Sequence, residues 1–104
     1  MSTVTDLETE AAGLPAWKSA IIGQVGPANI KLIKMDGRAI VAEVHDYDGA
    51  AFVVDGLLTL EFSDEARRVG LPTGAFFMIP AGQPHSILAG CRGTLLLVDL
   101  QDQN

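Results

Sequence analysis

The sequence predicts an all-β protein built as a sandwich or a barrel. From Ile30 onward, short apolar segments show the period-two alternation that is typical of half-buried strands. Turns that contain Gly, Pro or Asp separate these segments about every 8–12 residues. No amphipathic helix of useful length interrupts them. About eight short strands joined in this way are typical of sandwiches and barrels.

Length and composition limit both the fold and the partners. The chain has 104 residues, 48% of them hydrophobic, which allows one domain with one core. Its net charge is -6, and Arg67-Arg68 is its only local basic pair. Because affinity for nucleic acid and for anionic membranes depends on clustered positive charge, neither partner is expected. Prolines interrupt the longest apolar stretch, Gly70–Gly90, which excludes a membrane span.

Two further features concern the cell compartment. The single Cys91 excludes an intrachain disulfide and a multi-cysteine zinc site. The N-terminal residues are acidic and lack the basic and apolar regions of a secretion signal. A cytoplasmic location is therefore expected.

The first 29 residues are expected to form a strand-and-loop extension in front of the barrel. Within it, Val4–Ala12 favours a short helix, because acidic residues suit a first helical turn and Gly13-Leu14-Pro15 would end it. Trp17 either plugs the barrel end of its own chain or contacts a partner subunit.

The barrel domain is expected to occupy residues 30–104. Its predicted strands are Ile30–Lys34, Ala39–His45, Phe52–Val54, Leu57–Phe62, Ala75–Ile79, Pro84–Leu88 and Thr94–Leu100. Asp55-Gly56 is predicted to be the turn of a β-hairpin, because this dipeptide is a strong hairpin signal. The strands carry more apolar surface than one small barrel hides, which predicts a homodimer.

Two histidines in turn-rich surroundings are the candidate chemical groups. Glu43 and His45 are two residues apart in a predicted strand, so their side chains project to the same face. His85 follows the rigid turn Pro80–Pro84 at the start of another strand. If the two strands face each other, two imidazoles and one carboxylate converge, a set that suits iron, manganese, nickel or zinc. Spacing alone leaves open that both histidines are ordinary polar lining or surface groups.

The run Gly74–His85 resembles the second cupin motif, which has Gly, five residues, Pro-x-Gly, two residues and His. The run Gly37–Gly56 resembles the first motif, and the likeness covers roughly Ile30–Leu100. This resemblance implies a cupin jelly-roll β-barrel, also described as a double-stranded β-helix. It also implies that small cupins of this kind pair through an outer sheet.

The resemblance to the cupin motifs is incomplete at the positions of the family's metal ligands. The resemblance places one family histidine at Glu43 and the family glutamate at Gly49. The other two family ligands fall on His45 and His85. It therefore implies a metal site of Glu43, His45 and His85 for Fe, Mn, Ni or Zn, with one carboxylate in place of a histidine and one ligand missing.

Small residues stand where the family has large ones beside the site. The family Trp and Phe fall on Ala42 and Ala51, and an asparagine often found after the second motif falls on Ala89. The expected ligand pocket includes Tyr47, Gly49 and Ala51, although Tyr47 equally suits an exposed turn. Either the pocket is widened for a ligand or neighbouring residues fill the space.

Three functions remain open on the sequence alone. The chain is a divalent-metal-dependent enzyme that acts on a small molecule, a small-ligand-binding module without metal, or an oligomerising cupin whose pocket has no function. The sequence identifies neither the catalytic residues nor the substrate.

Overall fold

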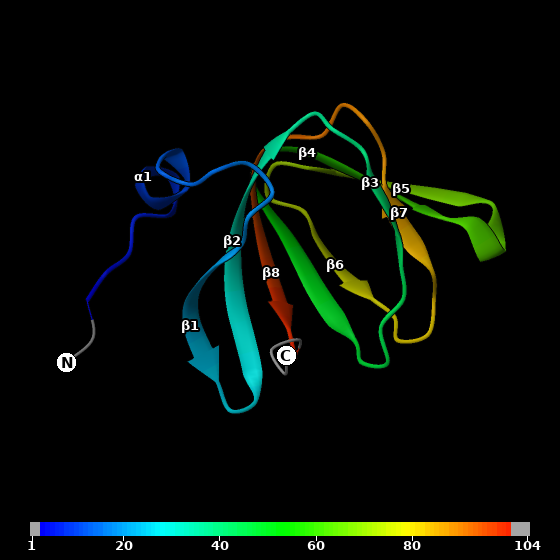
Figure 1. Ribbon diagram of the computed structural model, residues 1–104, viewed down its shortest axis with the longest axis horizontal. Coiled ribbons are helices and arrows are strands. Elements are labelled where there is room, and N and C mark those ends of the chain that lie inside the picture. Colours follow the sequence, from blue (N-terminus) through cyan, green and yellow to red (C-terminus); the bar gives the residue numbers. More distant parts are fainter. Residues whose placement is uncertain (1–2, 101–104) are drawn as a thin grey trace.

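The computed structural model describes residues 3–100 and shows eight strands in one curled antiparallel sheet (Figure 1). The strands are β1 (Ala20–Val25), β2 (Ala28–Asp36), β3 (Ile40–Glu43), β4 (Gly49–Phe62), β5 (Arg67–Pro72), β6 (Phe76–Ile79), β7 (His85–Ile87) and β8 (Arg92–Asp99). Helix α1 (Leu7–Ala12) precedes them, and the short 3-10 helix η1 (Ser63–Glu65) follows β4. The all-β prediction is confirmed. No helix in the described part of the chain has both the length and the apolar character that a membrane crossing requires.

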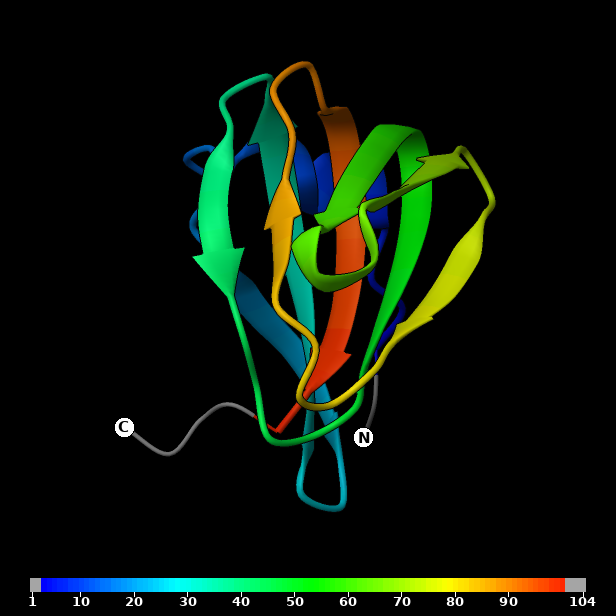
Figure 2. The same ribbon diagram turned by 90° about the vertical axis from the view of Figure 1, so that its right-hand side faces the viewer.

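Strand β4 belongs to both of the walls that the curled sheet forms (Figure 2). Its first residues, Gly49–Phe52, lie between β6 on one side and β8 on the other. Its last residues, Leu57–Phe62, pair with β5, and Leu60 and Glu61 also pair with β7. Strands β2 and β1 extend the β8 side, and β3 extends the β7 side. The 14 residues of β4 therefore connect the two walls.

The predicted hairpin at Asp55-Gly56 is wrong. Strand β4 runs through both residues without reversing, and its register against β8 shifts between Val53 and Asp55. Gly56 has a φ of 107°. Because a hairpin turn and a β-bulge both use glycine at positive φ, the dipeptide alone does not distinguish a reversal from a bend within one strand.

Gly56 faces Gly93 of β8, which also has a positive φ, of 105°. The two backbones approach so closely that a Cβ on Gly56 would collide with the Arg92 carbonyl. A Cβ on Gly93 would collide with the Asp55 carbonyl in the same way. The bend in β4 therefore requires glycine on both strands.

One hydrophobic core fills the space between the walls. Its buried members are Ile33, Met35, Ala51, Val53, Leu58, Leu60, Phe62, Leu71, Cys91 and Leu95. Strand β4 supplies half of this set, through alternate residues before its register shift (Ala51 and Val53) and after it (Leu58, Leu60 and Phe62). Cys91 is 1% exposed, and its thiol lies 3.2 Å from the Leu88 carbonyl oxygen. The turn thiol is thus part of the core.

The N-terminal residues are attached to the sheet at several points. Helix α1 begins at the cap Asp6, whose side chain accepts a hydrogen bond from the Thr9 amide at 3.1 Å. Strand β1 pairs with β2. These observations agree with a short helix before Gly13 and with a strand in the extension. The domain boundary at residue 30 stays a prediction.

Trp17 is fixed between the helix and the sheet. Its indole donates a hydrogen bond to Asp36 at 2.6 Å, and its backbone amide donates one to the Lys34 carbonyl at 2.8 Å. The Arg38 guanidinium, hydrogen-bonded to the Asp36 carboxylate, holds the pKa of that carboxyl below its usual range. Asp36 is therefore a charged acceptor for the indole near neutral pH.

Replacing Gly56 or Gly93 with alanine should destabilise the protein by about 3 kcal/mol or more, because the new methyl group meets backbone at an unfavourable φ. Urea denaturation followed by circular dichroism measures the change. Gly70→Ala is the matched control, since Gly70 also lies in a strand but a Cβ there meets nothing within 4 Å. Equal denaturation midpoints for Gly56→Ala and Gly70→Ala would contradict the close crossing.

Candidate functional site

The pairing of β3 with β7 brings the candidate residues together. Glu43, the last residue of β3, is the register partner of His85, the first residue of β7. His45 lies two residues beyond Glu43, and its Nε2 is 3.2 Å from Glu43 Oε1. The rings of His45 and His85 have centroids 5.6 Å apart. All three side chains therefore meet at one place, from segments 40 residues apart in the sequence.

Two hydrogen bonds donated by backbone amides join the turn before His85 to the segment that carries His45. The Gly82 amide donates to the His45 carbonyl at 2.7 Å. The Ala81 amide donates to the side chain of Asp48 at 2.9 Å. Because Pro80 and Pro84 restrict the backbone on either side, this turn fixes where β7 begins. The Pro-x-Gly part of the second motif thus positions His85 relative to His45.

His85 is buried, with 9% of its surface exposed. Its Nδ1 is 3.0 Å from the Gln83 carbonyl oxygen. A carbonyl can only accept, so in the neutral imidazole this contact assigns the proton to Nδ1 and leaves Nε2 as an acceptor. The Phe62 ring lies against the imidazole, with ring centroids 6.0 Å apart. His85 therefore offers one hydrogen-bond acceptor in apolar surroundings.

His45 and Glu43 are more open to solvent than His85. The side chain of His45 is 28% exposed and that of Glu43 is 54% exposed. The His45 ring stacks on Tyr47, with centroids 5.1 Å apart and planes inclined by 22°. Tyr47 thus supports the imidazole from one side, while Glu43 contacts its Nε2. The cluster changes from exposed at Glu43 to buried at His85.

These polar residues line a cavity of about 280 Å³ between the two walls. Most of its lining is apolar and includes core residues such as Ile33, Leu58, Leu60 and Leu95. Of the three residues predicted for the ligand pocket, Tyr47 and Gly49 line this cavity. Ala51 lies in the core and is fully buried. Glu43 and Gly49, the two altered ligand positions of the family pattern, therefore both border the cavity.

Several solved structures have a fold similar to that of this chain. A cupin-2 domain protein from Shewanella frigidimarina has a TM-score of 0.76 and 24% sequence identity, over 88% of this chain and 87% of that chain. A protein from Neisseria meningitidis has a TM-score of 0.81 and 22% identity, over 95% and 100%. The chain has the cupin fold. The predicted jelly-roll barrel is therefore confirmed.

A cupin of known activity is also similar in fold. Hydroquinone 1,2-dioxygenase, solved with Cd²⁺ and 4-hydroxybenzonitrile, has a TM-score of 0.80 and 17% identity, over 93% of this chain and 72% of that chain. No protein-family model matches the sequence, and no curated protein matches it. At these identities the likeness concerns the fold alone.

The donor atoms of the cluster are not arranged as a metal site. Among residues 3–100, no group of three or more His, Cys, Asp or Glu side chains is arranged to hold a metal ion. The contact between Glu43 and His45 explains part of this, because it engages the Nε2 of His45. Gly49, at the position of the family glutamate, supplies no side-chain donor. The residues as arranged therefore do not fit a bound metal.

Two charged residues of the cavity, Lys31 and Asp99, were not identified from the sequence, and Trp17, expected either to plug the barrel end or to contact a partner, lines the cavity as well. Strand β2 carries a lysine on each face, Lys31 with Ile33 on one and Lys34 with Leu32 on the other. Alternation alone cannot say which lysine points inward. Trp17 reaches the cavity through its contacts with Asp36 and Lys34, which local sequence patterns do not encode.

Restoring the two altered family positions with Glu43→His and Gly49→Glu should create a metal site, because four protein ligands would then surround one point. A Cβ at Gly49 would lie 3.4 Å from the Val98 carbonyl oxygen, an ordinary contact distance. Isothermal titration with Zn²⁺ should show tighter binding than in the wild type, and Zn²⁺ should raise the melting temperature. Gly70→Glu combined with Glu43→His is the control. Equal Zn²⁺ affinity in the two double variants would contradict the prediction.

Proposed function

We propose that the barrel cavity binds a small organic molecule, with a polar group at the Glu43–His45–His85 cluster and an apolar part against the walls. The observation that supports this most is that one cavity combines apolar walls with a few converging polar groups. Ligand pockets commonly have this composition. The single acceptor of His85 and the neighbouring contact between Glu43 and His45 would orient the polar group of the ligand. The walls would provide the contact area for its apolar part.

The size of the cavity limits the ligand. A dry protein cavity of about 150 Å³ holds benzene, so 280 Å³ suits a molecule of one substituted ring or a short branched chain. The dioxygenase with the same fold was solved with 4-hydroxybenzonitrile, a ligand of this size. That likeness supports a small, partly apolar ligand for this chain.

Ligand binding should be visible through Trp17, the single tryptophan, because it lines the cavity. A panel of one-ring and branched-chain compounds should contain members that change Trp17 fluorescence. Such a compound at 100 times its dissociation constant should stabilise the fold by about 2.7 kcal/mol, measured as a thermal shift. His85→Ala should weaken this binding, and Val25→Ser, at an exposed position of β1 outside the cavity lining, is the control. A panel without any such compound would argue against a ligand pocket.

A divalent metal held by Glu43, His45 and His85 is the second candidate. The 5.6 Å separation of the imidazole rings and the nearby carboxylate favour it. Metal binding would require the contact between Glu43 and His45 to break, so that both side chains can turn toward a shared ion. Metal analysis of the purified protein separates this candidate from the first, because only the second leads to a metal that is lost in His45→Ala and His85→Ala.

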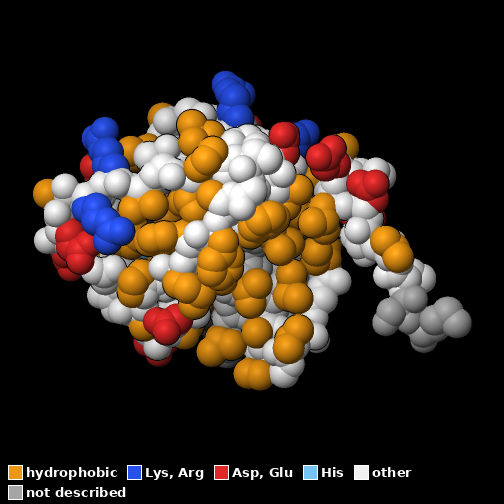
Figure 3. Space-filling view, turned by 180° about the vertical axis from the view of Figure 1, so that it is seen from behind, with side chains coloured by type: hydrophobic (Ala, Val, Ile, Leu, Met, Phe, Trp, Pro, Cys, Tyr) orange, Lys and Arg blue, Asp and Glu red, His pale blue; other side chains and the backbone are white. Residues whose placement is uncertain are grey.

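The outer face of the β6–β4–β8 region supports a homodimer. Phe76 and Met78 of β6 are 61% and 49% exposed. Phe52 of β4 is the register partner of both Phe76 and Leu96 of β8, so apolar residues continue across three strands. Figure 3 looks onto this face and shows hydrophobic side chains across its centre, with charged ones toward its sides. An extended apolar surface of this kind is typical of an interface, and we propose a second copy of the chain as the partner.

A homodimer should give a mass near twice 11.0 kDa in light scattering at micromolar concentration. Phe76→Ser with Met78→Asp should produce the monomer, because both side chains would lie in the interface and a buried aspartate would lack a partner. Val41→Ser is the control, since Val41 is 82% exposed on β3, away from this face. A wild-type mass near 11.0 kDa would refute the dimer.

A further inference from the structure

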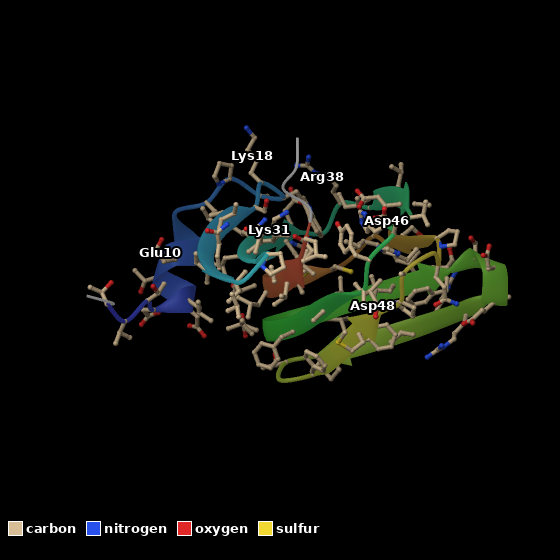
Figure 4. All side chains as sticks on the ribbon, turned by 90° about the horizontal axis from the view of Figure 1, so that it is seen from below. Glu10, Lys18, Lys31, Arg38, Asp46 and Asp48 are labelled. Atoms are coloured by element: carbon tan, nitrogen blue, oxygen red, sulfur yellow. The ribbon has the colours of Figure 1, made fainter. Side chains whose placement is uncertain are left out.

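The cavity contains an ion pair between Lys31 and Asp99, in addition to the contact between Glu43 and His45. Lys31 Nζ lies 3.2 Å from Asp99 Oδ1, and the two side chains are only 9% and 14% exposed. Viewed from below, Lys31 points into the space between the walls, whereas Lys18 and Arg38 point outward (Figure 4). Both members of the pair line the cavity.

Lys31 differs from every other basic residue of the chain. The chain has seven Lys and Arg residues, and all seven lie in the described part. Six of them are exposed, whereas Lys31 is 7% exposed. Its neighbours on the inner face of β2, Ile33 and Met35, are hydrophobic core residues. An ammonium group therefore lies on a face of β2 that also carries the buried Asn29 and hydrophobic core residues.

Stability alone does not account for this ion pair. Removing two charges from water costs about as much as their attraction returns, so a pair of apolar side chains would be at least as stable. A lysine at a cavity wall does, however, supply a positive charge and hydrogen-bond donors to whatever enters. Charge-assisted hydrogen bonds of this type are stronger than neutral ones.

We propose that Lys31 anchors the carboxylate of a small organic acid whose apolar part fills the cavity, and that Asp99 holds the ammonium in place when no acid is bound. This inference rests on the proposed ligand-binding function and adds the chemical class of the ligand. The apolar residues nearest along the strands, Ile33 on β2 and Leu97 on β8, would contact the body of the acid. The carboxylate of Asp99 competes with the acid for Lys31.

The test compares acids with their neutral amides, which have the same shape. Benzoate with benzamide, and 3-methylbutanoate with 3-methylbutanamide, are titrated into the full chain, and binding is followed by Trp17 fluorescence and by amide NMR shifts. In the wild type, the acid of at least one pair should bind at least about tenfold more tightly than its amide. This ratio is expected for a hydrogen bond to a charged group.

Variants of the ion pair identify the anchor. Lys31→Met should remove the preference for the acid, whereas Lys34→Met, on the outer face of the same strand, should preserve it. Asp99→Asn should strengthen acid binding and leave amide binding unchanged, because the competing carboxylate is gone. Substitution of a residue with only a structural role would change the affinities for the acid and for the amide alike. Since Lys31→Met alone removes one member of the Lys31–Asp99 pair, Lys31→Met with Asp99→Leu provides a second variant in which both charges of that pair are removed together.

The outcomes separate this inference from the proposed function. If the amides bind as tightly as the acids, or if both Lys31 variants keep the preference for acids, the cavity binds ligands but Lys31 is not the anchor. If neither acids nor amides bind to the wild type at millimolar concentration, both the inference and the ligand-binding function are wrong for molecules of this size. Loss of acid preference in both Lys31 variants, with tighter acid binding in Asp99→Asn, supports it.

Discussion

The contact between Gly56 and Gly93 is the constraint on which the rest of the barrel depends. The two backbones lie too close for any side chain, and both glycines have φ values that other residues rarely adopt. This contact lets β4 change partners along its length, from β6 and β8 to β5 and β7. Without that change the two walls would not face each other, and the cavity between them would not exist.

The fold was more predictable than the connections within it. Period-two alternation and turn residues suffice for an all-β barrel, because both follow from local geometry. Asp55-Gly56 shows the limit of such reasoning. The same dipeptide supplies positive φ to a hairpin or to a bend, and the choice depends on Gly93, a residue 37 positions away. Long-range backbone contacts of this kind leave no local pattern.

The candidate site shows the same division. Glu43 and His45 were found because their two-residue spacing puts them on one face of a strand, and His85 because the second motif, from Gly74 to His85, specifies a rigid turn before a strand. That spacing could not reveal that Glu43 contacts His45 directly. Lys31 was missed because its strand carries a lysine on each face, and only the position of β8 decides which face is inside. Charges inside a barrel are thus harder to predict than its strands.

The short pairing of β3 with β7 has a consequence for how the cavity is reached. Only Ile40 with Ile87 and Glu43 with His85 are register partners there, and β3 is an edge strand with mostly exposed residues. Segments with few ladder bonds and little buried surface detach at a lower free energy than the rest of a protein. Transient separation of β3 would open the cavity beside its polar cluster while β4 and the core stay folded. Local breathing of this edge would therefore give a ligand more access to the interior without global unfolding.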